Sequence, residues 1–414
     1  MSGYMKVLAE YSDKAGHKDR TGHIKRITGI ITAIIMLITT AVIVPVFCCA
    51  EEVSGPDIDT PSAILMEAAT GQVIYEKDAD TVLAPASITK IMTLILIFDA
   101  IHDGRIKMDD TVTVSEHAAS MGGSQVFLEA GETQTVETLI KCIAIASAND
   151  ACVAMAEYID TSEENFVAHM NERAKGLSMT NTNFVNCCGL DADNHVTTAR
   201  DVALMSKELI NKYPEIHNIS TIWMDTITHV TRRGESDFTL TNTNKLIKQY
   251  EWATGLKTGS TSLAGFCLSA TAKRNDIELI SVVMASKDGK SRVADSIKLL
   301  NYGYSLCQMY KDSNMPNIPS PGISGGMIKE LDCEYSDNFS YLFTEKYDEA
   351  LITKDFEFID GLKAPVNEGD VVGQLCYKYN GTLIGTIDVK SSVTVKKAGY
   401  KDYFSFLAKN VFCI

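Results

Sequence analysis

Apolar and polar residues recur along residues 58–311 with the periods of short strands and of helices. Residues 62–76, SAILMEAATGQVIYE, predict two strands around a turn at Thr70–Gly71. Apolar residues then recur at helical spacing, and we expect helices over 88–101, 135–147, 165–177, 198–213 and 291–307. The runs AGFCLSATA and IELISVVMAS, joined by the polar turn KRND, are typical of a strand pair. Strands at both ends with helices between them predict one antiparallel sheet covered by helices.

The pattern changes after residues 312–322, which are rich in Pro, Gly, Ser and Asn and predict a linker. β-branched runs and an Asn380–Gly381 hairpin signal then predict a small all-β domain over 318–396. The tail, 398–414, places six apolar or aromatic residues on one helical face: Tyr400, Tyr403, Phe404, Leu407, Val411 and Ile414. This favours an amphipathic helix that associates with a membrane surface. The alternative is a terminal helix docked on the β domain.

Residues 27–47 contain no charged side chain and follow Lys25 and Arg26. A basic flank, an apolar stretch and small residues at Cys48 and Ala50 predict a signal peptide over 1–50, with a basic N-terminal extension and cleavage after Ala50. The alternative is an uncleaved membrane anchor, since the stretch is long enough to span a bilayer. Both interpretations place the rest of the chain outside the cytoplasm.

Composition narrows the possible partners. The 414 residues are 45% hydrophobic and 22% charged, with a net charge of −15, which suits two folded domains and argues against nucleic-acid binding. The 11 cysteines show no CxxC spacing, so we expect small buried hydrophobes, with the state of Cys187–Cys188 left open. The histidines are scattered; His195 is expected to form hydrogen bonds in a loop. We expect no metal and no cofactor.

Ser87 is the only serine in the chain that has a lysine three residues later, Lys90. Residues three apart share a helix face, so the ammonium group can reach the hydroxyl. A serine hydroxyl becomes nucleophilic once a base takes its proton, and burial disfavours the charged form of a lysine. The spacing therefore suits a nucleophile and its base, although a serine at a helix start is more often a cap.

Two further motifs favour the catalytic interpretation of Ser87 over the capping one. Ser147-x-Asn149 directly follows an apolar helix, where polar side chains can line a cleft. Lys257-Thr258-Gly259 is the only Lys-Thr-Gly in the chain and opens a strand pair. A lysine and a threonine on an edge strand can bind a carboxylate, and the glycine lets substrate backbone approach closely.

The order Ser-x-x-Lys, Ser-x-Asn, Lys-Thr-Gly resembles the active-site trio of the serine penicillin-binding proteins and β-lactamases. The blocks SAILMEAATGQVIYEKDAD, ASMGGSQVFLEAGE, GLDADNHVTTARD and LAGFCLSATA resemble the low-molecular-mass penicillin-binding proteins, which are D-alanyl-D-alanine carboxypeptidases. The resemblance covers roughly 58–414. It implies an α+β fold: a β-lactamase/transpeptidase-like catalytic domain over 58–311, an all-β domain over 318–396 and an amphipathic helix over 398–414.

The resemblance also implies roles for individual residues. Ser87 would form the acyl-enzyme, Lys90 would be the general base, Ser147 would relay protons to the leaving D-alanine, and Asn149 would hold the substrate amide. Lys257, Thr258 and Gly259 would line the substrate carboxylate site, which Arg292 would complete. The backbone N–H groups of Ser87 and Ser260 would form the oxyanion hole. Two departures are Cys188, where relatives often have a histidine, and Ser260, where some have a larger residue.

The implied substrate is the pentapeptide stem of peptidoglycan, with β-lactam antibiotics as covalent inhibitors, at the outer face of the cell membrane. Three alternatives remain. A β-lactamase of the commonest class would need an E-x-x-L-N loop, and residues 150–257 contain none. An endopeptidase that cleaves cross-links would use the same residues. A wall-binding protein with a silenced site is the non-enzymatic alternative.

Overall fold

The computed structural model describes residues 55–231 and 234–412. The predicted signal peptide, 1–50, lies outside the described residues.

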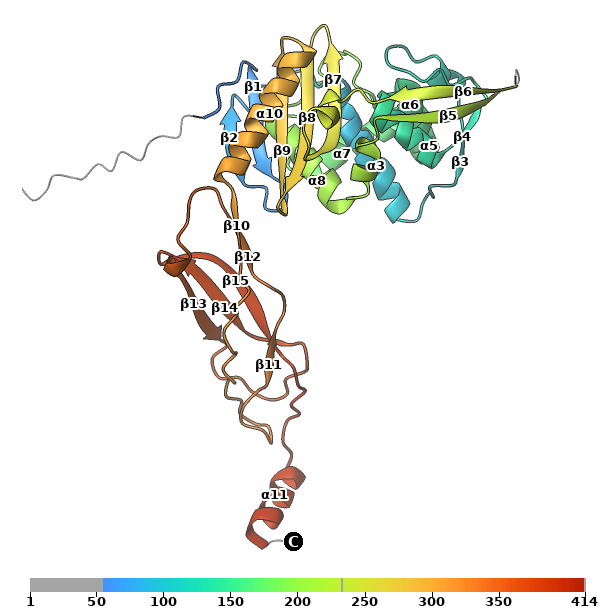
Figure 1. Ribbon diagram of the computed structural model, residues 1–414. Coiled ribbons are helices and arrows are strands. Elements are labelled where there is room, and N and C mark those ends of the chain that lie inside the picture. Colours follow the sequence, from blue (N-terminus) through green and yellow to red (C-terminus); the bar gives the residue numbers. More distant parts are fainter. Residues whose placement is uncertain (1–54, 232–233, 413–414) are drawn as a thin grey trace, which may run out of the picture. The chain divides into compact units, whose positions relative to one another are not determined.

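A five-stranded antiparallel sheet forms the centre of residues 55–311 (Figure 1). In spatial order the strands are β2 (Val73–Lys77), β1 (Ser62–Glu67), β9 (Ile277–Ser286), β8 (Gly265–Arg274) and β7 (Ala253–Thr261). The two predicted strand pairs, β1–β2 and β8–β9, are confirmed. The strand β7, which carries Lys257-Thr258-Gly259, was expected at a sheet edge and forms one.

Helices cover both faces of this sheet. Because successive strand residues point to opposite faces, Leu65 packs with Leu299 of α10 (Gly289–Leu306), whereas Ile64 packs with Met205 of α8 (Ala199–Lys212). A further long helix is α7 (Glu163–Gly176), and the short ones are η1 (Ala86–Thr89), α4 (Glu116–Ala119), α9 (Ile216–Ser220) and η3 (Lys245–Lys248). Two short hairpins complete this part: β3 (Thr111–Thr113) with β4 (Thr133–Thr135), and β5 (Met224–Thr231) with β6 (Gly234–Thr241).

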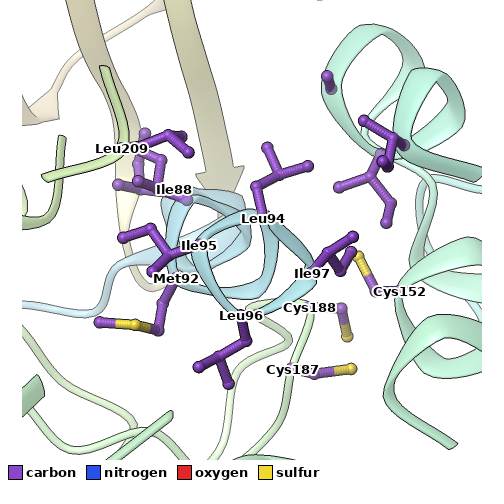
Figure 2. Packing of buried hydrophobic residues seen from close by; sticks show 14 of the residues in the cluster. Ile88, Met92, Leu94, Ile95, Leu96, Ile97, Cys152, Cys187, Cys188 and Leu209 are labelled. Atoms are coloured by element: carbon purple, nitrogen blue, oxygen red, sulfur yellow. The ribbon is translucent and has the colours of Figure 1, made fainter. Parts of the chain in front are cut away.

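The helix α3 (Lys90–His102) lies in the middle of the core. Apart from Thr93, its sequence is apolar on all sides from Ile91 to Phe98, as expected of a helix that neighbours surround completely. Figure 2 shows its side chains packed outward in every direction, toward Leu209 on one side and Cys152 on another. Lys90, the first residue of α3, is therefore held in a rigid and dry environment.

The predicted helix over 135–147 differs from the structure. An α-helix, α5 (Val136–Lys141), passes into a π-helical segment, η2 (Cys142–Ala146), and Ser147 follows in a left-handed conformation, φ 63°. The wider π turn ends the regular helix before Ser147, and such segments are frequent at functional sites. A further helix, α6 (Asn149–Asp160), was not predicted.

The remainder of the chain is dominated by strands. β10 (Gln308–Lys311) pairs with β12 (Ser340–Phe343), and a four-stranded sheet has the order β11 (Cys333–Tyr335), β15 (Thr382–Ser391), β14 (Val371–Tyr379), β13 (Ile352–Phe358). A short helix, η4 (Glu349–Leu351), precedes β13. The predicted Asn380–Gly381 hairpin is confirmed, with both residues at positive φ. This part has its own core, where Tyr377 stacks on Phe339 with centroids 3.7 Å apart.

A helix, α11 (Tyr400–Phe412), occupies the predicted position at the C-terminus. Its aromatic and apolar side chains up to Leu407 are exposed, including Tyr400 at 89% and Phe404 at 67%. The side chain of Val411 and the whole of Ile414 lie outside the described part. Across residues 55–231 and 234–412, no helix has both the length and the apolarity needed to cross a bilayer.

The cysteines in the described part of the chain agree with the expectation from the sequence. Eight are free thiols, and all of them except Cys333 are buried. Six of them belong to the hydrophobic cores of residues 55–311 as small apolar side chains: Cys142, Cys152, Cys187, Cys188, Cys267 and Cys307. Cys187 and Cys188 are both free and buried, beside α3.

Candidate active site

Ser87 lies in a tight turn directly before α3. The turn, η1, opens with Ala86 in the left-handed region, φ 47°, and leaves Ser87 half-buried. Two glycines press against its backbone: a Cβ on Gly189 would lie 1.9 Å from the Ala86 carbonyl oxygen, and one on Gly259 would lie 2.9 Å from the Ser87 nitrogen. Non-glycine residues at positive φ are uncommon and cluster at functional sites. The Ser87 backbone is thus held by close contacts on two sides.

Lys90 reaches back to Ser87, as its spacing predicts. Its Nζ donates hydrogen bonds to Ser87 Oγ at 3.0 Å, Asn149 Oδ1 at 2.6 Å and the Cys188 carbonyl at 2.6 Å. The side chain is fully buried. The structure therefore brings together residues of the first and second motifs, and it adds a backbone carbonyl that the sequence did not point to.

The second motif begins α6 and fixes the loop beside it. Asn149 donates from Nδ2 to the Gly122 carbonyl at 2.7 Å, and its backbone N–H donates to the Ser124 carbonyl at 2.8 Å. The Asp150 carboxylate, fully buried, accepts from the backbone N–H groups of Val126 and Leu128 at 3.1 Å each. Burial raises the pKa of Asp150. This accounts for the conformation of ASMGGSQVFLEAGE, the loop expected to border the cleft.

The third motif lies on β7, whose outer edge pairs with no other strand of the sheet. Lys257 is buried, and its Nζ donates to the Thr258 carbonyl at 3.1 Å. Burial, reinforced by the positive charge of Lys90, holds the pKa of Lys257 well below its ordinary value. The Thr258 and Thr243 hydroxyls are 2.7 Å apart. Ser260, one residue beyond the motif, is exposed. An open strand edge can receive an extended peptide through main-chain hydrogen bonds.

Arg292 joins this strand from α10. Its Nη1 donates to the Gly259 carbonyl at 2.9 Å and to the Cys267 carbonyl at 3.1 Å. The guanidinium lies over the Phe266 ring, 5.6 Å from its centroid. Burial lowers the pKa of Arg292. Arg292 is therefore adjacent to Lys-Thr-Gly, as expected, although both of these hydrogen bonds go to backbone carbonyls.

Two family models match the chain. The model described as D-alanyl-D-alanine carboxypeptidase matches residues 49–288. The chain belongs to the D-alanyl-D-alanine carboxypeptidase family. A second model, penicillin-binding protein 5, C-terminal domain, matches residues 322–397. These two matches confirm the predicted family, and with it the predicted activity of a serine-type D-Ala-D-Ala carboxypeptidase.

Individual relatives agree with this assignment. D-alanyl-D-alanine carboxypeptidase DacF of Bacillus subtilis is 41% identical over 345 residues, which cover 83% of this chain and 87% of the relative. DacC of Escherichia coli is 33% identical, over 86% of this chain and 88% of the relative. The crystal structure of penicillin-binding protein 5 from Haemophilus influenzae matches with a TM-score of 0.70 and 28% identity, covering 83% of this chain and 99% of that structure. These matches confirm the expected α+β fold class.

His195 supports the turn that holds Ser87, a contact that the sequence did not predict in this carboxypeptidase-family chain. His195, expected only as a hydrogen-bonding loop residue, accepts the Val185 N–H at Nδ1, so its proton is on Nε2. The Nε2–H donates to Thr89 Oγ1 at 2.9 Å, and that hydroxyl donates to the Ala86 carbonyl at 2.8 Å. Burial lowers the pKa of His195 to about 4, which keeps the ring neutral. His195 thus supports the strained residue that precedes Ser87, and no local sequence signal linked the two.

Proposed function

We propose that this chain removes the terminal D-alanine from peptidoglycan pentapeptides through an acyl-enzyme on Ser87. The observation that carries the proposal is the position of the Lys90 amine, 3.0 Å from Ser87 Oγ, with two other acceptors around it. The family match supports the same reaction.

The three contacts of Lys90 suit a general base. A neutral amine has two N–H groups and one lone pair. In this neutral form the two N–H groups would keep Asn149 Oδ1 and the Cys188 carbonyl as acceptors. The lone pair would then accept from the Ser87 hydroxyl, in place of the hydrogen bond that a charged Nζ donates to it. In the proposed step the Ser87 proton passes to Lys90 as Oγ attacks the carbonyl carbon of the penultimate D-alanine.

The leaving group departs when the C–N bond breaks and the amine of the terminal D-alanine takes a proton. We assign the relay of this proton to Ser147, which is buried next to Asn149. Water then hydrolyses the ester on Ser87 and regenerates the enzyme. The backbone N–H groups of Ser87 and Ser260 would donate to the developing oxyanion.

Substrate binding is assigned to β7. The stem peptide would lie along the open edge of this strand, with its amide held by Asn149. Its terminal carboxylate would lie near Lys257, Thr258 and Arg292, with Gly259 leaving room for the peptide backbone. The partly buried guanidinium of Arg292 supports the assignment, since a carboxylate offsets the cost of removing this charge from water.

The test measures free D-alanine released from diacetyl-Lys-D-Ala-D-Ala by the purified protein. Release should stop with benzylpenicillin and in Ser87→Ala, and Ser87→Ala should also lose covalent labelling by fluorescent penicillin. Lys90→Ala should keep the fold and lose acylation. Wild-type protein that releases no D-alanine would contradict the proposal.

We also propose that the enzyme acts outside the cytoplasm, at the outer face of the cell membrane, and contacts the lipid surface through α11. The exposed Phe404 and Leu407 support this, because an interfacial helix buries such side chains in lipid. Co-sedimentation with anionic vesicles should fall in the Phe404→Ser, Leu407→Ser double variant. It should be unchanged in Ser405→Ala, on the same helix. Equal binding by all three proteins would argue against lipid contact.

A further inference from the structure

A cavity of about 910 Å³ lies between η3, β8 and the first turns of α10. Its lining combines an apolar surface, formed by Phe266, Val293 and Ile297, with three cationic side chains, those of Lys245, Lys290 and Arg292. A site of this composition suits a ligand that has apolar and negatively charged parts.

The positive charge in the cavity is not neutralised by the protein. In the described part of the chain, 55–231 and 234–412, none of the three cations forms an ion pair. The one acidic lining residue, Asp288, uses its carboxylate to cap α10, accepting the N–H groups of Lys290 and Ser291 at 2.8 and 2.7 Å. The cavity is therefore a local positive region on a chain whose net charge is −15.

Arg292 connects this cavity with the catalytic strand. Its Nη1 binds the carbonyl of Gly259, in the Lys-Thr-Gly motif. Its Nε is buried and has no hydrogen-bond partner among the described residues. A buried donor without an acceptor is unusual in a folded protein and is explained if a ligand supplies the acceptor.

We propose that this cavity is a leaving-group subsite for anionic leaving groups larger than D-alanine, such as the acceptor strand of a cross-linked peptide. The inference rests on the proposed function, in which the end of the substrate that leaves lies toward Arg292. The bonds made and broken are those of D-alanine release: the ester forms on Ser87 Oγ, the D-Ala–amine bond breaks, and the amine leaves with a proton. Water then hydrolyses the ester. The site would thus support endopeptidase as well as carboxypeptidase cleavage.

The test compares two peptides with the same acyl part, diacetyl-Lys-D-Ala-D-Ala and diacetyl-Lys-D-Ala-D-Glu, using the purified full-length protein. Reversing both exposed cations, in Lys245→Glu, Lys290→Glu, should lower kcat/KM for the D-Glu peptide about tenfold relative to the D-Ala peptide. The matched control is Lys248→Glu. Lys248 shares η3 and the same charge, but its Nζ lies over the Trp223 ring, away from the cavity lining. It should change the ratio less than twofold.

Each outcome decides the proposal. The proposal is supported if the ratio of kcat/KM for the D-Glu peptide to that for the D-Ala peptide falls in the double variant. Added salt should then move the ratio of the double variant back toward the wild-type value. An unchanged ratio overturns the proposal, as does an equal fall in Lys248→Glu, which would indicate a general field effect. If both substrates lose activity equally, the cavity does not select leaving groups. Wild-type protein that releases nothing from the D-Ala peptide refutes the proposed function instead, and this inference with it.

Discussion

The packing of Gly189 against the nucleophile turn gives a sharp prediction. Gly189 has φ 89°, and a Cβ there would lie 1.9 Å from the Ala86 carbonyl oxygen and 2.4 Å from its carbon. Heavy atoms in contact are ~3.5 Å apart, so the turn or the loop must move by more than about 1 Å in Gly189→Ala. The neighbouring Cys188 carbonyl, which binds Lys90, would move with the loop.

The expected loss can be separated into two parts. An alanine in the left-handed region costs about 1–2 kcal/mol wherever it occurs. A displacement of about 1 Å at reacting groups lowers a rate about 100-fold. We therefore expect Gly189→Ala to lower the rate of acylation at Ser87 by about 100-fold or more, beyond the loss of stability that the backbone strain alone produces.

The matched control is Gly104→Ala. Gly104 has φ 72°, and no atom lies within 4 Å of the position its Cβ would take, so this variant undergoes the strain without the collision. The assay is the rate of labelling by fluorescent penicillin, measured beside urea unfolding. Gly189→Ala protein that is folded and acylates as fast as Gly104→Ala would refute the view that Gly189 sets the geometry of Ser87.

Two further predictions concern buried titratable groups. The pKa of His195 is lowered from 6.5 to about 4, so between these pH values the unfolded state binds a proton that the folded state does not bind. The free energy of unfolding should therefore fall by about 3 kcal/mol as the pH drops from 6.5 to 4. Urea unfolding at several pH values should show a shallower fall in His195→Asn; parallel curves would disprove this. Asp150→Asn should destabilise by about 1–3 kcal/mol, since an amide NH₂ would face a backbone donor. The control is Asp109→Asn at an exposed position, which should leave the free energy of unfolding unchanged. An equal loss of stability in both variants would show that the hydrogen bonds to the Asp150 carboxylate are unimportant.

Much of this protein follows from the sequence because its signals are local. Periodicity predicted the strand pairs and most of the helices, since the 2.0 and 3.6 periods are properties of the backbone. The pairing of Ser87 with Lys90 needed only the geometry of one helical turn. The order of the three motifs was enough to indicate the family, whose model matches residues 49–288.

The tertiary structure decided which groups meet across long stretches of chain. The Cys188 carbonyl binds Lys90 from 98 residues away, and His195 binds Thr89 from 106 residues away. Neither contact has a local pattern, because a carbonyl is present at every residue and a lone histidine has many uses. The change from α-helix in α5 to π-helix in η2 also depends on packing, since the apolar sequence there suits a regular α-helix equally well. Sequence thus fixes which side chains carry the chemistry, whereas packing fixes the backbone groups that orient them.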